Sequence, residues 1–93
     1  MSTLKRLLEG YGVQVCFADL GDWGDSELRS EYDPAVPQIR ISRRLRADLI
    51  PFALGHELYH HREAIGEVAV LKDRRAREAA ANAYASALLE GAT

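Results

Sequence analysis

Two histidines four residues apart, with a glutamate after the first, are the best candidates for chemistry in this chain: His56-Glu57-Leu58-Tyr59-His60. On a helix such histidines lie on one face about one turn apart, so both imidazoles can point at one metal ion. Imidazole nitrogens are common ligands of tetrahedral Zn²⁺, and an adjacent glutamate can act as general base toward water. The pattern therefore predicts a Zn²⁺ site built on His56 and His60, with Glu57 as catalytic base. The alternative is a pair of half-exposed histidines on an amphipathic helix.

A catalytic zinc also needs a third protein ligand and leaves its fourth position to water. Glu63 follows His60 too closely to reach the same ion without a sharp turn of the chain. Glu78 is preferred, because it lies on the next predicted helix, on a stripe whose alanines allow close approach. The competing interpretation is a solvated Glu78 paired with Arg74, four residues earlier. The acidic residues considered for this position are Glu63, Glu67, Asp73, Glu78 and Glu90.

Other residues near the motif are assigned supporting or structural roles. Asn82, one turn after Glu78, is predicted to hydrogen-bond a metal ligand or a facing main-chain group. His61 points about 100° away from His60 on a helix, which predicts a surface histidine. Tyr32 and Tyr59 are the candidates for a phenol that stabilises a tetrahedral intermediate, although a structural role is favoured for each.

The elements that must position these residues follow an α+β order. A short helix is predicted from Ser2 or Thr3 to Gly10, because Leu4, Leu7 and Leu8 share one face. Alternating apolar residues predict a strand, and turn residues at 21–25 separate it from two further strands. About three strands are thus expected, at residues 13–17, 27–32 and 38–41.

Two helices complete the order. The first is predicted from an N-cap at Asp48, with Pro51 in the first turn, to about His61. The second runs from about Asp73 to a C-cap at Gly91 and is rich in alanine, so it can pack closely and antiparallel against the first. The predicted buried stripe of the first helix is Leu49, Phe52, Ala53, Leu54 and Leu58.

Length and composition define the class of protein. The 93 residues predict a single domain over 1–93, and 47% hydrophobic and 28% charged residues are typical of a globular chain. The apolar runs are far shorter than the ~20 residues that cross a bilayer, so no membrane association is expected. The lone Cys16 suits a reducing cytoplasm. The net charge of −2, with acids interleaved among the arginines, argues against direct nucleic-acid binding.

Two separated segments resemble the ImmA/IrrE family of zinc metallopeptidases. They are residues 52–60, which contain the histidine motif, and the later stretch in which Glu78 precedes Asn82 and Leu88-Leu89. The similarity spans roughly residues 10–90 and implies a small zincin-like domain. In the family, a Glu-x-x-x-Asn/Asp pattern supplies the third ligand, which implies that role for Glu78. Family members cut a partner repressor that carries a helix-turn-helix domain, which implies such a substrate here.

The sequence thus predicts a cytoplasmic zinc endopeptidase with His56, His60 and Glu78 as ligands and Glu57 as base. One alternative is a catalytically silent, metal-stabilised domain that regulates by binding a repressor or a toxin or antitoxin partner. A second alternative is a metal-free interaction module. Loss of activity in Glu57→Gln with zinc retained separates the first alternative from the enzyme, and elemental analysis tests the second.

Overall fold

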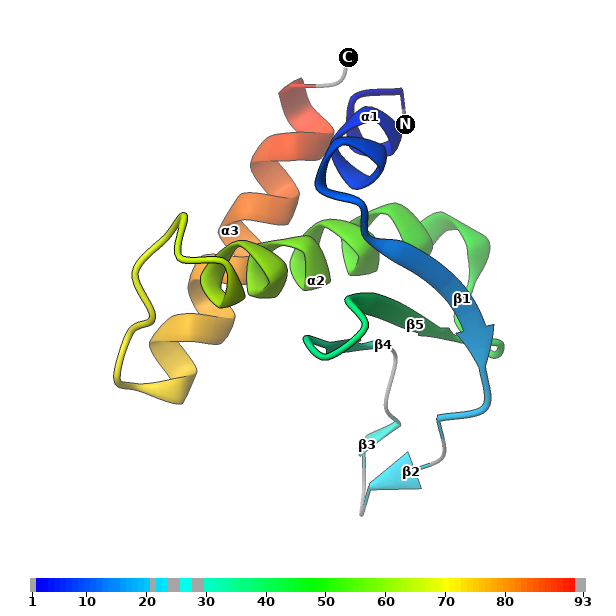
Figure 1. Cartoon of the computed structure of the whole chain (residues 1–93). Helices are drawn as coiled ribbons and strands as arrows, with labels where there is room; N and C mark the ends of the chain where they lie inside the picture. Colours follow the sequence, from blue (N-terminus) through cyan, green and yellow to red (C-terminus); the bar gives the residue numbers. More distant parts are fainter. Residues whose placement is uncertain (1, 21, 24–25, 28–29, 92–93) are drawn as a thin grey trace.

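The structure is a computed structural model that describes residues 2–20, 22–23, 26–27 and 30–91. It confirms the α+β class, with three α-helices and a three-stranded sheet in the described part of the chain (Figure 1). The helices are α1 (Ser2–Tyr11), α2 (Ile50–Ala64) and α3 (Arg74–Gly91). The strands are β1 (Gln14–Ala18), β2 (Asp22–Trp23), β3 (Ser26–Glu27), β4 (Ser30–Asp33) and β5 (Gln38–Ser42).

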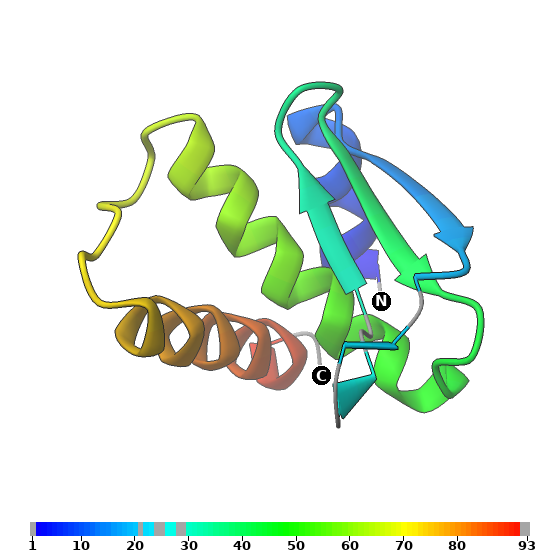
Figure 2. The same cartoon turned by 90° about the horizontal axis from the view of Figure 1, so that it is seen from below.

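The main sheet has the order β1-β5-β4, with β1 parallel and β4 antiparallel to the central strand β5. The strand predicted over 27–32 is replaced by two: β3 pairs with β2 in a separate small hairpin, and β4 joins the main sheet. Residues 28–29, between them, lie outside the described residues. Because β5 is central, β4 forms the sheet edge that approaches the histidine helix, as Figure 2 shows.

Helix α2 packs against α3 on one side and on β4 and β5 on the other, and its contact with the sheet forms the core. Ile39 and Ile41 of β5 and Leu58 of α2 are fully buried. Phe17 of β1 shares a sheet face with Ile41, yet it is 51% exposed because α2 lies over the other two strands. The other members of the core are Leu4, Leu8, Val13, Ala53 and Leu54.

The start of α2 differs from the prediction. A short 3₁₀ turn at Ala47–Leu49 precedes the helix, and Leu49 occupies the N-cap position without a side-chain cap. The Asp48 carboxylate instead accepts hydrogen bonds from Arg46, so the predicted Asp48 cap is wrong. Pro51 does lie in the first turn, where its missing N–H leaves no intrahelical bond unmade. Leu49 and Phe52, predicted to be buried, are half-exposed.

The chain reverses after α2, and α3 crosses it at a wide angle in the opposite sense, with Ala85 near Gly55 and Arg77 near Glu63. Gly66, with φ of 82°, ends α2 in a left-handed conformation that favours glycine. Asp73 then accepts the main-chain N–H of Arg75 at 3.3 Å and so satisfies a free donor at the start of α3. The helices approach each other closely at Gly55, where an added Cβ would lie 3.1 Å from Cα of Ala85.

Ala81 and Ala85 are fully buried in this contact, which is the close approach that the alanine-rich sequence predicts. None of the helices in the described ranges combines the length and apolar character needed to cross a bilayer.

Candidate metal centre

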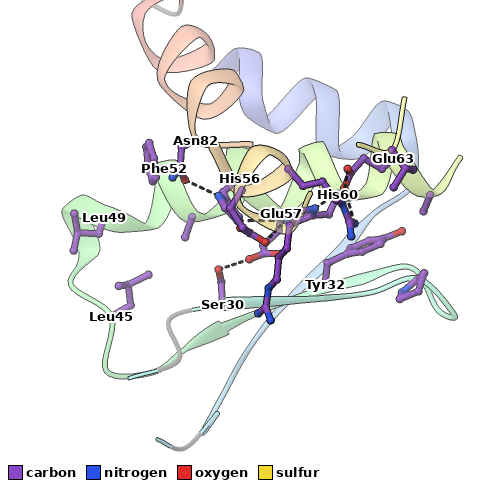
Figure 3. Close-up of a pocket in the computed structure, with 17 residues that line it drawn as sticks. Ser30, Tyr32, Leu45, Leu49, Phe52, His56, Glu57, His60, Glu63 and Asn82 are labelled. Atoms are coloured by element: carbon purple, nitrogen blue, oxygen red, sulfur yellow. Dashed lines mark hydrogen bonds and ion pairs between the residues drawn. The ribbon is translucent and has the colours of Figure 1, made fainter. Parts of the chain in front are cut away.

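Helix α2 places two imidazoles side by side at the centre of a groove. His56 and His60 lie one turn apart, and their Nε2 atoms are 3.3 Å from each other (Figure 3). Each side chain is largely shielded, with 17% and 15% of its surface exposed. The i, i+4 spacing of the motif therefore results in two nitrogen donors that face one point.

Helix α3 brings the Glu78 carboxylate to the same point. Its Oε2 lies 2.8 Å from Nε2 of His56, and its Oε1 lies 3.5 Å from Nε2 of His60. Ligands at zinc distances of 2.0–2.2 Å occupy tetrahedral corners that are roughly 3.3 Å apart. The three donors already have separations near this value, so the residues present fit a tetrahedral zinc ion.

The other acids considered for the third position lie elsewhere. Glu63 contacts the opposite nitrogen of His60, Glu67 is hydrogen-bonded to Tyr11 and Arg62, and Asp73 begins α3. Glu90 lies three turns beyond Glu78 on the same helix. The alternative ion pair between Glu78 and Arg74 does not form among the described residues. Glu78 pairs with the two histidines instead.

Glu57 lies beside the metal site on the buried side of α2. Its carboxylate oxygen and one nitrogen of each histidine lie within 4.8 Å of one another, so it is close enough to bind an ion itself. However, its Oε2 accepts a 2.6 Å hydrogen bond from the Ser30 hydroxyl of β4. The Glu78 carboxylate lies 2.8 and 3.5 Å from the two Nε2 atoms and is not engaged by Ser30, so it is the acid that the geometry favours as third ligand candidate.

The environment of Glu57 suits a base that must also release a proton. Burial raises its pKa, the Ser30 hydrogen bond and the two imidazoles oppose that rise, and Glu78 adds to it. The net pKa is above the usual value for glutamate. A raised pKa makes a carboxylate a better proton acceptor than an ordinary glutamate.

The Nδ1 atoms of His56 and His60, which point away from the candidate metal position, are each hydrogen-bonded to a side-chain oxygen. Nδ1 of His56 lies 2.7 Å from Oδ1 of Asn82, so the structure brings Asn82 to a candidate ligand as the sequence suggested. Nδ1 of His60 lies 2.6 Å from Oε1 of Glu63. In each pair the oxygen is an acceptor, so the Nδ1–H donates and the Nε2 lone pair remains available for a metal.

Sequence reasoning considered Glu63 only as a direct ligand and missed this contact. Glu63 is a buried residue, and its carboxylate also accepts hydrogen bonds from Arg77. Burial raises the pKa of Glu63, but the bonds from Arg77 and His60 outweigh it and hold the pKa below its usual range. The signal available in the sequence was the i, i+3 spacing from His60, which places an acid within reach of Nδ1.

Tyr32 and His61 form a pair on the sheet side of α2. The Tyr32 hydroxyl lies 2.6 Å from Nδ1 of His61, and the ring of Tyr11 packs edge-on against the same imidazole. His61 is 4% exposed, so the predicted surface histidine is wrong, because β4 and α1 cover that side of the helix. Tyr59 contacts the rings of His60 and Tyr84.

The candidate ligands open into a groove of about 760 Å³. Figure 3 shows Leu45, Leu49 and Phe52 at one end, with Tyr32 and Glu63 toward the other. The half-exposed Leu49 and Phe52 thus line the groove instead of filling the core. A groove with apolar ends and polar groups converging at its centre is typical of a ligand or substrate site.

Comparison with known proteins agrees with this geometry. The sequence model of a peptidase family, described as the IrrE N-terminal-like domain, matches residues 8–89. This range contains α2, the whole sheet and all but the last two residues of α3, and with them every residue of the candidate metal centre. A search of curated proteins finds no match to the chain.

Proposed function

The chain belongs to the peptidase family of the IrrE N-terminal-like domain, and on this premise we propose that it is a zinc-dependent endopeptidase. The observation that carries the proposal is the convergence of Nε2 of His56, Nε2 of His60 and the Glu78 carboxylate, 2.8–3.5 Å apart. These three groups would hold the zinc ion. When bound there, zinc supplies Lewis-acid polarisation of a carbonyl and lowers the pKa of water.

Glu57 moves the proton in this proposal. Its carboxylate removes a proton from the attacking water and delivers it to the amide nitrogen that leaves. Ser30 holds one carboxylate oxygen at 2.6 Å, which fixes the position of the side chain and leaves the other oxygen free for water. General base catalysis of this kind contributes roughly 10²–10⁴-fold to a rate.

The edge strand β4 offers a place for an extended substrate. It supplies Ser30 and Tyr32 to the groove and pairs only with β5 among the described strands. An extended peptide can add to such an edge through main-chain hydrogen bonds, with its scissile bond between β4 and the histidines. The strand β5, by contrast, is paired on both sides and has no free edge for a peptide.

We infer that the substrate is a cytoplasmic repressor with a helix-turn-helix domain, cut in an exposed linker. The support is the resemblance to proteases that act on such repressors, together with a groove suited to an extended segment. A small domain makes few contacts with a free peptide, so little binding energy is available for catalysis unless the substrate also docks on another surface of the domain. An unfolded general substrate such as casein should therefore be cut slowly.

The test is co-expression with the helix-turn-helix regulator encoded nearby, followed by mass spectrometry for a discrete fragment. The matched control is Glu57→Gln, which keeps the size of the side chain and should retain about one zinc per chain while the fragment disappears. Fragment formation by Glu57→Gln at the wild-type rate would contradict the assigned base. Rapid digestion of casein without effect on the regulator would refute the dedicated substrate and leave the zinc chemistry standing.

The competing candidate is a silent domain that binds its partner and uses zinc only for stability. The observation that favours it is that the proposed ligands come from both α2 and α3, so a bound ion would tie the helices together whether or not it acts in catalysis. Stable zinc binding together with capture of the regulator, but no fragment from the wild-type protein, would support this candidate.

A further inference from the structure

A buried carboxylate lies directly behind one of the candidate metal ligands. Glu63 follows His60 by one helical turn on α2, and only 3% of its side-chain surface is exposed. Its Oε1 lies 2.6 Å from Nδ1 of His60, the nitrogen that faces away from the metal position. A charged group is costly to bury unless it is paired and hydrogen-bonded, so this placement requires compensation.

Arg77 of α3 provides that compensation. Its Nε donates to Oε2 of Glu63 at 3.1 Å, and its Nη2 donates to Oε1 at 3.2 Å. Two guanidinium N–H groups on one carboxylate fix its orientation as well as its charge. Because Arg77 precedes Glu78, consecutive residues of α3 reach both sides of the same imidazole. Glu78 approaches Nε2 directly, and Arg77 acts on Nδ1 through Glu63.

The two candidate histidines are held unequally. His56 donates to the amide oxygen of Asn82, an exposed and neutral acceptor, whereas His60 donates to a buried and ionised one. A carboxylate is the stronger acceptor and increases the basicity of the opposite nitrogen more than an amide does. His60 is therefore the better oriented and more strongly donating imidazole.

We propose that Glu63, held by Arg77, is a positioning residue that keeps the proton of His60 on Nδ1 and presents its Nε2 to the metal. The inference rests on the proposed function, because it requires His60 to be a zinc ligand. Loss of an acceptor of this kind weakens metal binding by roughly 10- to 100-fold. We expect that loss in Glu63→Ala and a smaller one in Glu63→Gln, whose amide oxygen can still accept the Nδ1 proton.

The experiment measures zinc affinity by competition with a chelator, and the absorption spectrum of the Co²⁺-loaded protein, on the full chain. Glu67→Gln is the matched control, because Glu67 is an acid just beyond the end of α2. It accepts hydrogen bonds from Tyr11 and, at 3.2 Å, from Arg62, and among the described residues it contacts neither candidate histidine. The proposal is supported if zinc affinity falls from the wild type to Glu63→Gln and further to Glu63→Ala, the cobalt spectrum of the variants changes, and Glu67→Gln behaves as the wild type. Arg77→Met should weaken binding in the same direction while the carboxylate is retained, and it serves if the Glu63 variants fail to fold.

A purely structural role gives a different result. In that case Glu63→Ala lowers the melting temperature of the metal-free protein, but its zinc affinity stays within twofold of the wild type and its cobalt spectrum is unchanged. That result overturns the positioning role while His60→Ala still loses zinc, so the proposed function stands. If His60→Ala binds zinc as tightly as the wild type, the proposed function and this inference both fail.

Discussion

Substitution of Gly55 by alanine tests the close contact of α2 and α3, which positions the residues of the candidate metal centre. Alanine in a helix interior is favoured over glycine by about 0.5–1 kcal/mol. In α2, however, the new Cβ would lie 3.1 Å from both Cα and Cβ of Ala85, and a main-chain atom can yield only if α3 moves. Overpacking of this kind costs about 1–3 kcal/mol, so Gly55→Ala should be destabilising by about 1 kcal/mol net.

Gly10→Ala is the matched control for this prediction. Gly10 lies in α1, where an added Cβ meets nothing within 4 Å, so alanine there should stabilise by up to about 1 kcal/mol. At about 4–8 °C per kcal/mol for a domain of this size, the melting temperatures of the two variants should differ by at least about 4 °C. Thermal denaturation followed by circular dichroism, with and without zinc, measures the difference.

The displacement of α3 has a consequence for the metal site. Glu78 and Asn82 lie on the same helix as Ala85, so outward movement of α3 should separate Glu78 from the histidines and weaken zinc binding. Gly10→Ala should leave zinc affinity unchanged. If Gly55→Ala melts higher than the wild type and binds zinc equally well, the close approach of the two helices is wrong.

Three further results are expected. Removal of zinc by a chelator should lower the melting temperature of the wild type but not of His60→Ala, because a ligand present at about 100 times its Kd stabilises the fold by about 2.7 kcal/mol. Equal sensitivity of both proteins would exclude His60 as a ligand. Ser30→Ala should reduce kcat by about tenfold with zinc content unchanged, because Glu57 loses the charge-assisted hydrogen bond that orients it. An unaltered kcat would show that Ser30 does not orient the base. Burial lowers the pKa of His61, so this imidazole binds a proton more readily in the unfolded chain than in the folded one, and the metal-free protein should lose stability as the pH falls below about 6.5. Chemical denaturation across pH 5–8 should show a shallower loss of stability for His61→Gln. Identical stability curves for the two proteins would contradict this account.

The histidine motif could be interpreted from sequence because its geometry is local. Four-residue spacing on any helix places His56 and His60 on one face, and the Nε2 atoms lie 3.3 Å apart in the structure. The alanines of α3 similarly indicated a close helix pair, because small side chains allow backbones to approach. The limits of α1, β1 and β5 were also predicted to within one residue at each end, since apolar periodicity is itself a local property.

Predictions that depended on what lies opposite a side chain were less successful. His61 was expected at the surface, but β4 and α1 cover it, and Leu49 and Phe52 were expected in the core, but they line the groove. Strand order had the same limitation. Alternation identified β5 as a strand, but its central position in the sheet depends on long-range pairing.

By itself, then, the sequence determined which residue types could bind zinc and which helices carry them, because helical periodicity fixes the relative directions of neighbouring side chains. Only the tertiary structure decided the distances between helices. The packing of α3 across Gly55 sets Glu78 at 2.8 Å from His56 and seats Arg77 on the buried Glu63. The physical reason is that a carboxylate acts as ligand, base or orienting group according to the donor that faces it, and in this protein those donors lie on a different element or on the next turn of the same helix.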